Sequence, residues 1–300
     1  MPVSRHCLLI HNPIAGRRRG RYLARVVRAM EAEGCRVEAV ATRARGHAEE
    51  LSATARDGAF DVVVGAGGDG TLNEIACGLA GSAMPLAIVP LGTANVLAAE
   101  IGLPRAPALL ARLVARGAPR EIRLGLAAGR TAQRHFILMA GVGFDAHVVR
   151  GVNPALKRRI GKGAYAFEML RQARHYEFSG FRALIDGVEH QAASLVASNG
   201  RLYGGPHLIA PAARLDEPML HVCIFERGGT LDVIRYGLAL VTGTLPGTAG
   251  FRVVPAREVI VLAPPGDPVQ GDGDLLATLP ITLSVANETL RLVMPEATAG

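Results

Sequence analysis

The feature that most constrains this chain is a run of valines that passes directly into glycines. Val62 to Val64 has the pattern of a buried central strand, and Gly65-Ala66-Gly67-Gly68-Asp69-Gly70 separates it from a helical pattern that begins at Thr71. Glycines let a backbone approach a bound group closely, and the free N–H groups at the start of a helix carry partial positive charge. The segment therefore predicts a strand–turn–helix unit that binds an anion.

The rest of the first third alternates strand and helix patterns. Apolar strand-like runs lie at His6–Ile10, Val37–Ala41, Asp61–Ala66 and Leu86–Val89, and helical patterns lie at Arg21–Glu33, His47–Arg56, Thr71–Ala80 and Pro107–Arg116. Strands that alternate with helices indicate βαβ units and a mainly parallel sheet.

The pattern changes after Gly117. Short strand patterns follow at Glu121–Leu126, Phe136–Ala140, Arg182–Ile185, Ser194–Ala197, Leu220–Phe225, Glu258–Leu262 and Leu290–Met294, with one long helical stretch from about Ala155 to His175. A chain of 300 residues is longer than one typical domain. We therefore expect an α/β domain followed by a β-rich domain.

Other interpretations of the glycine-rich turn are weaker. The turn also fits GxGxxG, but a dinucleotide site needs an acidic residue about 20 positions later, and Pro90 stands there. A carboxylate such as Asp69 would repel a bare pyrophosphate, whereas it suits a magnesium ion that bridges ATP oxygens. The chain has no GxxxxGK[ST] segment, and a plain structural turn is the remaining alternative.

The charge balance favours partners that carry phosphate. Lys and Arg exceed Asp and Glu by 33 − 26 = +7, which suits nucleotides, nucleic acids or anionic lipid surfaces alike. The excess is concentrated in two runs, Arg17, Arg18, Arg19, Arg21, Arg25 and Arg28, and Lys157, Arg158, Arg159, Lys162, Arg171 and Arg174. Solvated helix faces are the alternative interpretation of both runs.

No apolar run approaches the ~18 residues that a membrane span requires. We therefore expect a cytoplasmic protein whose membrane contact is peripheral. The scattered Cys7, Cys35, Cys77 and Cys223 form no CxxC pair and are expected to be buried thiols.

Five segments in order resemble the diacylglycerol, sphingosine and bacterial lipid kinases. Gly67-Gly68-Asp69-Gly70-Thr71-Leu72-Asn73 is similar to the family's nucleotide signature. The other matches are Asn12-Pro13-Ile14-Ala15-Gly16, Thr42 with Gly46-His47-Ala48, Pro90-Leu91-Gly92-Thr93-Ala94-Asn95, and Asp272-Gly273-Asp274. They span about residues 8 to 275, nearly the whole chain.

The resemblance implies two domains. A nucleotide-binding α/β domain would cover residues 1–122, and a β-sandwich lipid domain would cover 123–286, with ATP and the lipid hydroxyl meeting in a cleft between them. The tail, 287–297, would return to the first domain.

The resemblance also assigns roles for ATP and Mg²⁺. The nucleotide would be held by Asn12, Thr42, Gly67, Gly68, Asp69, Gly70, Thr71, Leu72, Asn73 and Thr93. Asp69 would bind the catalytic magnesium, while Asp274 would accept the proton of the lipid hydroxyl and Asp272 would orient it.

Three departures from the family pattern affect these assignments. Val96 replaces the usual Asp after the PLGTxN turn, and Asp274 replaces the family's Glu, so the base is one methylene shorter. A structural magnesium would be held by the Glu217 side chain and by the carbonyls of Arg214 and Met219. At that site Glu217 stands for Asp and Pro218 for Gly.

The expected partners are a lipid substrate at a membrane surface and anionic phospholipids, without nucleic acid, and a homodimer is possible. The sequence does not distinguish diacylglycerol from ceramide, a sphingoid base or phosphatidylglycerol. Two alternatives remain open: a soluble kinase similar to NAD kinases, against which the PLGTxN turn argues, and a catalytically inactive nucleotide sensor, which the Asp274 replacement motivates.

Overall fold

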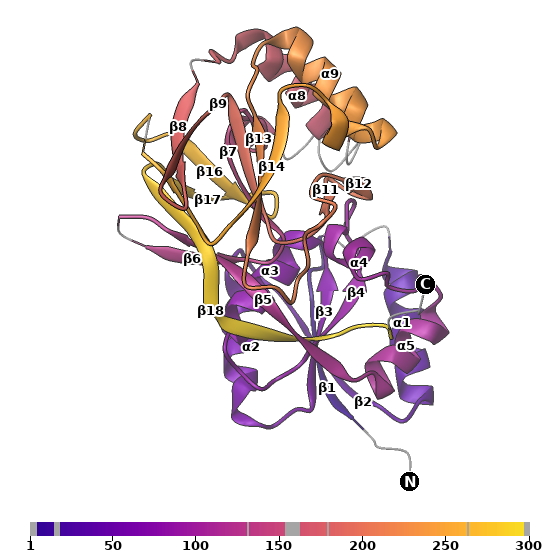
Figure 1. Cartoon of the computed structure of the whole chain (residues 1–300). Helices are drawn as coiled ribbons and strands as arrows, with labels where there is room; N and C mark the ends of the chain where they lie inside the picture. The colour runs from indigo at the N-terminus through magenta and orange to yellow at the C-terminus, as the bar shows by residue number, and fades with distance from the viewer. Residues whose placement is uncertain are drawn as a thin grey trace. The chain divides into compact units, whose positions relative to one another are not determined.

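The computed structural model describes residues 5–14, 19–130, 132–153, 163–178, 180–262 and 264–296 (Figure 1). The chain forms two compact units. Unit 1 comprises Met1–Ile122 together with Asn287–Gly300, and unit 2 comprises Arg123–Ala286. Two strands, β5 (Pro119–Ala128) and β18 (Ile281–Val293), run across the boundaries between the units.

Unit 1 contains a parallel sheet with helices on both faces, as the alternating pattern predicts. Its strands are β1 (His6–His11), β2 (Arg36–Ala41), β3 (Val62–Gly67) and β4 (Leu86–Pro90), in the order β2-β1-β3-β4. The end of β18 adds to β4 in parallel, with Leu292 opposite Leu86. The helices are α1 (Gly20–Ala32), α2 (His47–Thr54), α3 (Asp69–Leu79), α4 (Val96–Glu100) and α5 (Pro107–Arg116), and a 3-10 turn covers Ala55–Asp57.

Alternation along β3 explains how the helices are held. Val62 and Val64 pack in one core with Met30 of α1 and Leu110 of α5. Gly65, the next residue after Val64, faces the other way, where a Cβ would come within 2.8 Å of Leu72 on α3. The strand therefore buries both of its faces, as central strands of parallel sheets do.

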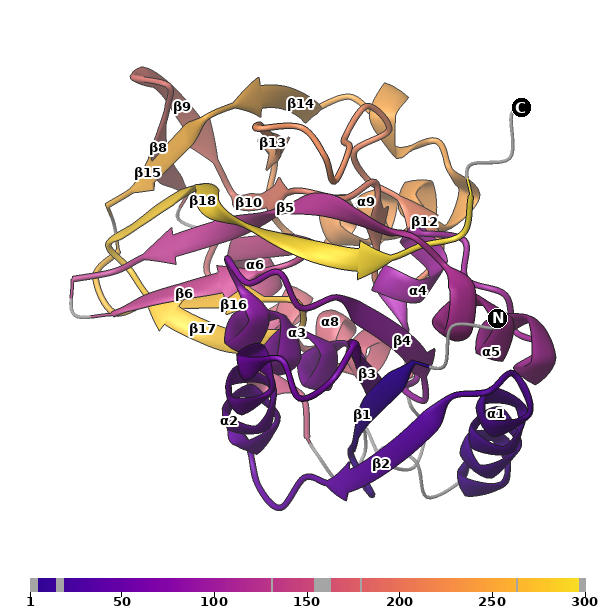
Figure 2. The ribbon, with the colours of Figure 1, turned by 90° about the horizontal axis from the view of Figure 1, so that it is seen from below.

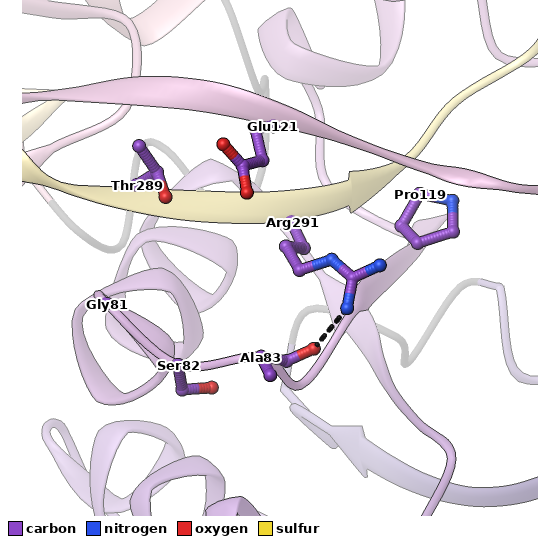
Figure 3. A pocket seen from close by; sticks show the side chains of 7 residues that line it. All are labelled: Gly81, Ser82, Ala83, Pro119, Glu121, Thr289 and Arg291. Carbon is purple, nitrogen blue, oxygen red and sulfur yellow. Dashed lines mark hydrogen bonds between the residues drawn. The ribbon is translucent and has the colours of Figure 1, made fainter.

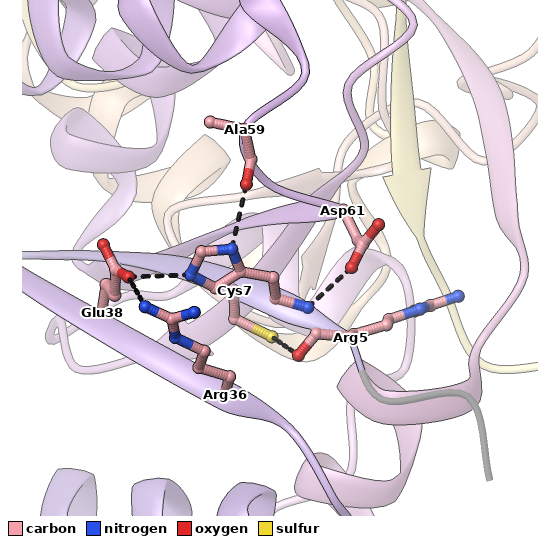
Figure 4. A network of polar contacts seen from close by, with 7 residues as sticks. Arg5, Cys7, Arg36, Glu38, Ala59 and Asp61 are labelled. Carbon is pink, nitrogen blue, oxygen red and sulfur yellow. Dashed lines mark hydrogen bonds and ion pairs between the residues drawn. The ribbon is translucent and has the colours of Figure 1, made fainter.

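A polar network ties together the amino ends of three strands in unit 1 (Figure 4). The backbone N–H of His6 donates to the Asp61 carboxylate over 2.7 Å, and its ring nitrogens contact the Ala59 carbonyl and the Glu38 carboxylate, each at 2.9 Å. Arg36 also pairs with Glu38, at 3.0 Å. These contacts fix the start of β1 between β2 and β3.

Unit 2 is built from two antiparallel sheets. Among the described residues, one is the antiparallel part of the sheet that also contains β1 to β4, and it consists of β6 (Gln133–Phe136), β8 (Phe181–Ile185), β9 (Val188–Ala192), β15 (Glu258–Val261) and the adjoining parts of β5 and β18. The other has the order β14-β13-β10-β7-β16-β17. The second sheet consists of β7 (Met139–Gly143), β10 (Ser194–Ser198), β13 (Leu220–Phe225), β14 (Phe251–Ala256), β16 (Pro268–Gly271) and β17 (Asp274–Thr278). Phe136 and Leu283 from the first sheet share a core with Val142 and Leu195 from the second. This packing confirms the predicted β-sandwich.

Three longer helices accompany the sandwich: α6 (Phe144–Gly151), α8 (Gly163–His175) and α9 (Thr230–Thr242). A short hairpin, β11 (Leu202–Tyr203) with β12 (His207–Leu208), and a 3-10 turn at Leu245–Gly247 complete the unit. Only α8 corresponds to the helix expected from Ala155 to His175, whose first part falls largely outside the described residues.

The strand expected at Phe136–Ala140 is wrong as a single element. Phe136 ends β6 and Met139 begins β7, with a bend between them. The backbone N–H groups of Ile137 and Leu138 donate to the Asp272 carboxylate instead of joining a ladder. A side chain distant in sequence thus interrupts an apolar run that looks continuous.

No helix among the described residues is long and apolar enough to cross a membrane. A shallow hollow of about 450 Å³ in unit 1 is lined by Gly81, Ser82, Ala83, Pro119, Glu121, Thr289 and Arg291 (Figure 3). Arg291 donates there to the Ala83 carbonyl over 3.0 Å. None of the predicted site residues lines this hollow, so it plays no part in the candidate site.

Candidate functional site

The nucleotide motifs of unit 1 lie at one edge of the parallel sheet. In register, His11 stands opposite both Ala41 and Ala66, and Gly67 stands opposite Pro90, so the four strands end together. Figure 2 shows β1, β2, β3 and β4 side by side. The loops after these strands therefore converge, and the carboxyl edge of such a sheet is where α/β proteins bind ligands.

The glycines of the two central loops are required because neighbouring atoms leave no room for a Cβ. A Cβ on Gly67 would lie 2.6 Å from Cβ of Thr71, and one on Gly92 would lie 2.5 Å from Cα of Gly68. The N–H groups of Leu91 and Gly92 donate to the Gly67 carbonyl, over 2.8 and 3.1 Å. The glycine-rich turn and the Pro90–Asn95 turn are thus bonded to each other through their backbones.

Asp69 joins the same two loops through its side chain. It is the first residue of α3, and its Oδ1 accepts the backbone N–H of Leu97 over 3.4 Å. Burial raises the pKa of the Asp69 carboxyl above its usual value, while N–H groups of Leu97, Val96 and Asn95 lower it. The carboxylate therefore lies at the amino ends of both α3 and α4, whose unpaired N–H groups favour negative charge.

Asn12 and Thr42 lie on the neighbouring loops. Asn12 donates its backbone N–H to the Ala66 carbonyl over 3.0 Å, and its side-chain Nδ2 reaches Oγ1 of Thr71 over 3.3 Å. Thr42 donates its N–H to the His11 carbonyl over 2.9 Å. The ends of β1, β2 and β3 are held together by these bonds. Of the opening Asn12–Gly16 motif, Ala15 and Gly16 lie outside the described residues.

The remaining predicted nucleotide residues differ in what they can offer. Thr93 is exposed on its turn, and Gly70 is half-buried in the first turn of α3. Leu72 is fully buried and faces the sheet, so only its backbone could contact a ligand. Asn73 is half-buried, and its Oδ1 has no hydrogen-bond partner.

Two residues of this edge were missed by sequence reasoning as individual site residues. Arg19 belongs to a basic run, and its Nη1 donates to the Pro90 carbonyl over 3.2 Å, at the end of β4. Asn95 has a left-handed backbone, with φ 48°, and its Nδ2 donates to the Gly92 carbonyl over 2.9 Å while its buried Oδ1 has no partner. The PLGTxN motif could have identified Asn95, whereas nothing in the basic run distinguished Arg19 from its neighbours.

In unit 2, Asp272 is bonded to backbone. Its carboxylate accepts the N–H groups of Ile137, Leu138 and Met139 over 2.6, 2.9 and 3.1 Å. Its own backbone is left-handed, with φ 51°. Three N–H donors occupy both oxygens, so Asp272 holds the β16–β17 turn against the β6–β7 bend.

A second set of bonds, buried or partly buried, supports the same turn. Gln270 accepts the Gly273 N–H over 2.9 Å through Oε1 and donates through Nε2 to Asp145 over 2.7 Å. The other oxygen of Asp145 accepts the Tyr203 hydroxyl. A Cβ on Gly141 would collide with Asp145, so glycine there makes room for the pair. Sequence reasoning missed this chain because each residue stands alone in an ordinary apolar context.

Asp274 stands beside this supported turn. It is the first residue of β17, lies opposite Gly271 and is half-exposed. The role of Asp274 as proton acceptor stays a prediction.

The residues of the expected structural magnesium site form a local ion pair instead of an open cage. The Glu217 carboxylate lies 3.3 Å from Nε of Arg214, and the Arg214 carbonyl accepts the Glu217 N–H over 3.2 Å. The guanidinium also pairs with Asp216, at 3.0 Å. A cation would have to displace Arg214 from both carboxylates, so these residues do not fit the proposed ion as they stand, and the role of Arg214, Glu217 and Met219 stays a prediction.

Both parts of the chain match known families. Residues 6–127 match the diacylglycerol kinase catalytic domain, and residues 139–294 match the YegS C-terminal NAD kinase beta sandwich-like domain.

Relatives extend over almost the whole chain. A Pseudomonas aeruginosa protein named "Probable lipid kinase YegS-like" is 33% identical, over 98% of this chain and 96% of its own. A diacylglycerol kinase of Bacillus subtilis is 29% identical, over 96% of each chain. The crystal structure of a diacylglycerol kinase from Bacillus anthracis is similar in fold, with a TM-score of 0.77, 21% identity and coverage of 97% of this chain and 98% of that one. The chain therefore belongs to the diacylglycerol kinase family of lipid kinases.

Proposed function

We propose that this chain transfers the γ-phosphate of ATP to the hydroxyl of a membrane lipid such as diacylglycerol. The observation that carries the proposal is the carboxyl edge of the unit 1 sheet. Two glycine turns are bonded to each other there, and the Asp69 carboxylate joins the starts of α3 and α4. Such an edge suits a triphosphate, and the family of the chain supplies the lipid as acceptor.

The unit 1 residues bind and orient the nucleotide. First-turn N–H groups of α3 cradle the phosphates, and Gly67 and Gly68 allow the backbone to come close to them. Arg19, Asn12, Thr42 and Thr93 border the same edge and contact the rest of the nucleotide. Phosphoryl transfer depends on such positioning and on charge neutralisation.

The donor set at this edge fits a magnesium ion. Asp69 supplies a carboxylate, and Asn73 and Asn95 each carry a buried amide oxygen without a hydrogen-bond partner. Magnesium prefers oxygen ligands, usually one or two carboxylates together with substrate phosphates. Asp69 would hold the ion. Asn73 lies in the same helix as Asp69, and the backbone N–H of Asn95 hydrogen-bonds to the Asp69 carboxylate. When bound, the ion neutralises charge that develops on the phosphate oxygens.

Unit 2 supplies the proton acceptor. Asp274 accepts the proton of the lipid hydroxyl, and Asp272 and Gln270 hold the backbone of the turn from which Asp274 projects. Asp272 therefore orients the base by fixing the backbone, because its own oxygens are already occupied by three N–H groups. The shorter Asp274 side chain makes the position of that backbone more critical than a glutamate would.

We also propose that the enzyme acts at the cytoplasmic surface of a membrane as a peripheral protein, because a membrane lipid is its proposed acceptor. Basic side chains attract anionic headgroups, and the run Lys157, Arg158, Arg159 and Lys162 is the sequence feature that favours this. These four residues lie outside the described part of the chain. Their role in membrane approach is part of the proposal.

One experiment tests the proposal against its rivals. Purified protein is incubated with γ-labelled ATP, Mg²⁺ and a total lipid extract, in parallel with NAD in place of lipid. A labelled lipid that is lost with Asp69→Asn supports lipid phosphorylation and identifies the acceptor. Label in NADP would indicate a soluble nucleotide kinase, and ATP binding without any labelled product would indicate a nucleotide sensor.

A further inference from the structure

Helix α9 of unit 2 leaves an apolar stripe exposed. Leu231, Ile234, Leu238 and Val241 have 83, 39, 63 and 66% of their surface exposed. Their spacing of three, four and three residues puts them along one side of the helix. Val233, Tyr236 and Ala239 on the other side are buried. The helix thus has two apolar faces, of which the sandwich covers only one.

Helix α8 packs beside α9 (Figure 1) and also exposes apolar side chains. The Thr230 hydroxyl donates to the Ala173 carbonyl over 2.7 Å, and Met169 lies 3.6 Å from where a Cβ on Gly237 would be. These contacts make the helices antiparallel. Phe167 and Leu170 of α8 are 57 and 50% exposed.

These six side chains form what we call the α8–α9 patch: Phe167, Leu170, Leu231, Ile234, Leu238 and Val241. They are six of the eleven large apolar side chains that are exposed among the described residues. Exposed apolar residues scattered singly need no explanation, but a gathered set marks an interaction surface.

The charges on the two helices select the kind of partner. Each helix has one acidic residue, and each is paired: Glu168 with Arg171 at 2.6 Å, and Asp232 with Arg235 at 3.1 Å. Arg174 of α8 is exposed and follows Ala173, whose carbonyl accepts the hydroxyl of Thr230 at the start of α9. Arg227, also exposed, precedes α9 by three residues. Of the acids just outside the helices at this end, Glu226 pairs with Arg252 and Glu177 is exposed. The apolar stripe thus has exposed cations at one end and no unpaired acid on either helix, which complements an anionic bilayer surface.

We propose that the α8–α9 patch inserts into the interfacial layer of a bilayer that contains anionic lipids. Amphipathic helices bind in this way, with their apolar face at the boundary between headgroups and acyl chains. A second copy of the chain is the alternative occupant that the test distinguishes. The inference rests on the proposed function, since a lipid acceptor with long acyl chains stays in the bilayer.

The test compares vesicle binding of matched variants of the full chain. Leu231→Gln with Leu238→Gln removes two exposed apolar side chains from the patch, and Leu109→Gln, on a residue of α5 that is 58% exposed, is the control. We expect cosedimentation with phosphatidylglycerol–phosphatidylcholine vesicles to weaken tenfold or more for the double variant and less than twofold for the control. Both proteins should keep the wild-type Tm, because the replaced side chains are exposed.

Activity is measured on dioctanoylglycerol dispersed in detergent and on long-chain diacylglycerol in vesicles. The double variant should match wild type on the first and lose activity on the second. Vesicle binding equal to wild type would overturn the proposal, and so would a loss of self-association in place of vesicle binding. If wild type phosphorylates no lipid but its vesicle binding still depends on the patch, the proposed function fails and the surface assignment stands.

Discussion

The backbone N–H of Leu97 donates to the Asp69 carboxylate over 3.4 Å, so one side chain links the loops that follow β3 and β4. Asp69 is thus both the expected ligand of a magnesium ion and the cap of α4. Substitutions at this position separate the two roles, because an amide keeps an oxygen acceptor and loses the charge.

Asp69→Asn should therefore retain the fold and lose turnover. The amide oxygen still accepts backbone N–H groups, but a neutral side chain cannot offset the charge of a cation. We expect kcat to fall by a factor of about 10² or more, with an unchanged Tm. Asp69→Ala should in addition lose about 0.5–2 kcal/mol of stability, the usual cost of a helix cap. Near-normal activity in folded Asp69→Asn would remove the metal assignment.

Asp274→Asn should lower kcat by a factor of about 10² to 10⁴, the usual contribution of a positioned base. ATP affinity should stay nearly constant because the residue belongs to unit 2 and the nucleotide motifs to unit 1. Asp274→Glu, which restores the family residue, should remain active.

Asp272→Ala is the companion variant. It leaves three backbone N–H groups without their acceptor and should cost on the order of 2–4 kcal/mol of stability. Urea unfolding and steady-state kinetics of Asp272→Ala, Asp272→Asn and Asp274→Asn test which carboxylate is the base. If Asp274→Asn turns over like wild type while folded Asp272→Asn has no activity, the base is Asp272.

Gln270→Met should reduce kcat while leaving KM for ATP unchanged. The apolar replacement has a similar volume, but it cannot accept the Gly273 N–H or donate to Asp145, so the turn that carries Asp274 loses one of its two supports. Gln270→Glu keeps the acceptor for Gly273 and should recover part of the activity in acidic buffer, where the carboxyl can be protonated and donate. Equal kcat in wild type, Gln270→Met and Gln270→Glu would show that Asp272 alone fixes the turn.

Asp145 gives a prediction about pH. Burial raises the pKa of this carboxyl, although hydrogen bonds from Tyr203 and Gln270 lower it. A raised folded pKa means that ionisation reduces the free energy of unfolding as pH rises from the unfolded value to the folded one. Asp145→Asn should remove that loss, so the free energy of unfolding of the variant minus that of wild type should grow as pH rises above the unfolded pKa of about 4. Urea unfolding at several pH values measures the difference, and a constant or falling difference contradicts the sign.

Charge reversal at Lys157, Arg158, Arg159 and Lys162 should weaken binding to anionic vesicles, because each cation near such a surface contributes roughly 1 kcal/mol. Wild-type binding should also weaken with salt. Arg21, Arg25 and Arg28 are exposed on one side of α1, and their reversal is the control. If the two sets of variants bind alike, the Lys157–Lys162 run is a solvated segment.

Much of unit 1 follows from sequence because its signals are local. Strong periodicity predicted every strand from β1 to β4, and the bounds of α5 agree with Pro107–Arg116. Helix α4 was missed because it is five residues long and is held by a carboxylate from another loop. In unit 2 α9 was missed because apolar residues occupy both its buried and exposed sides, which blurs the helical pattern.

The roles at the Asp272–Asp274 turn were less accessible to sequence reasoning. The motif placed two carboxylates on either side of Gly273 and gave no sign that the first is bonded to three backbone N–H groups. That distinction depends on Ile137, Leu138 and Met139, which lie more than 130 positions earlier in the chain. It also depends on Gln270, whose neighbours give no sign that its amide is bonded at both ends.

The return of β18 to unit 1 has a consequence for synthesis. Leu292 pairs with Leu86, so the edge of β4 is covered by a strand that leaves the ribosome about 200 residues after β4 itself. Until then a nascent unit 1 exposes an unpaired, apolar strand edge, the kind of edge that promotes association between chains. Truncation before Asn287 would leave the edge of β4 unpaired in the finished protein. We therefore expect β18 to limit aggregation as well as to complete the sheet.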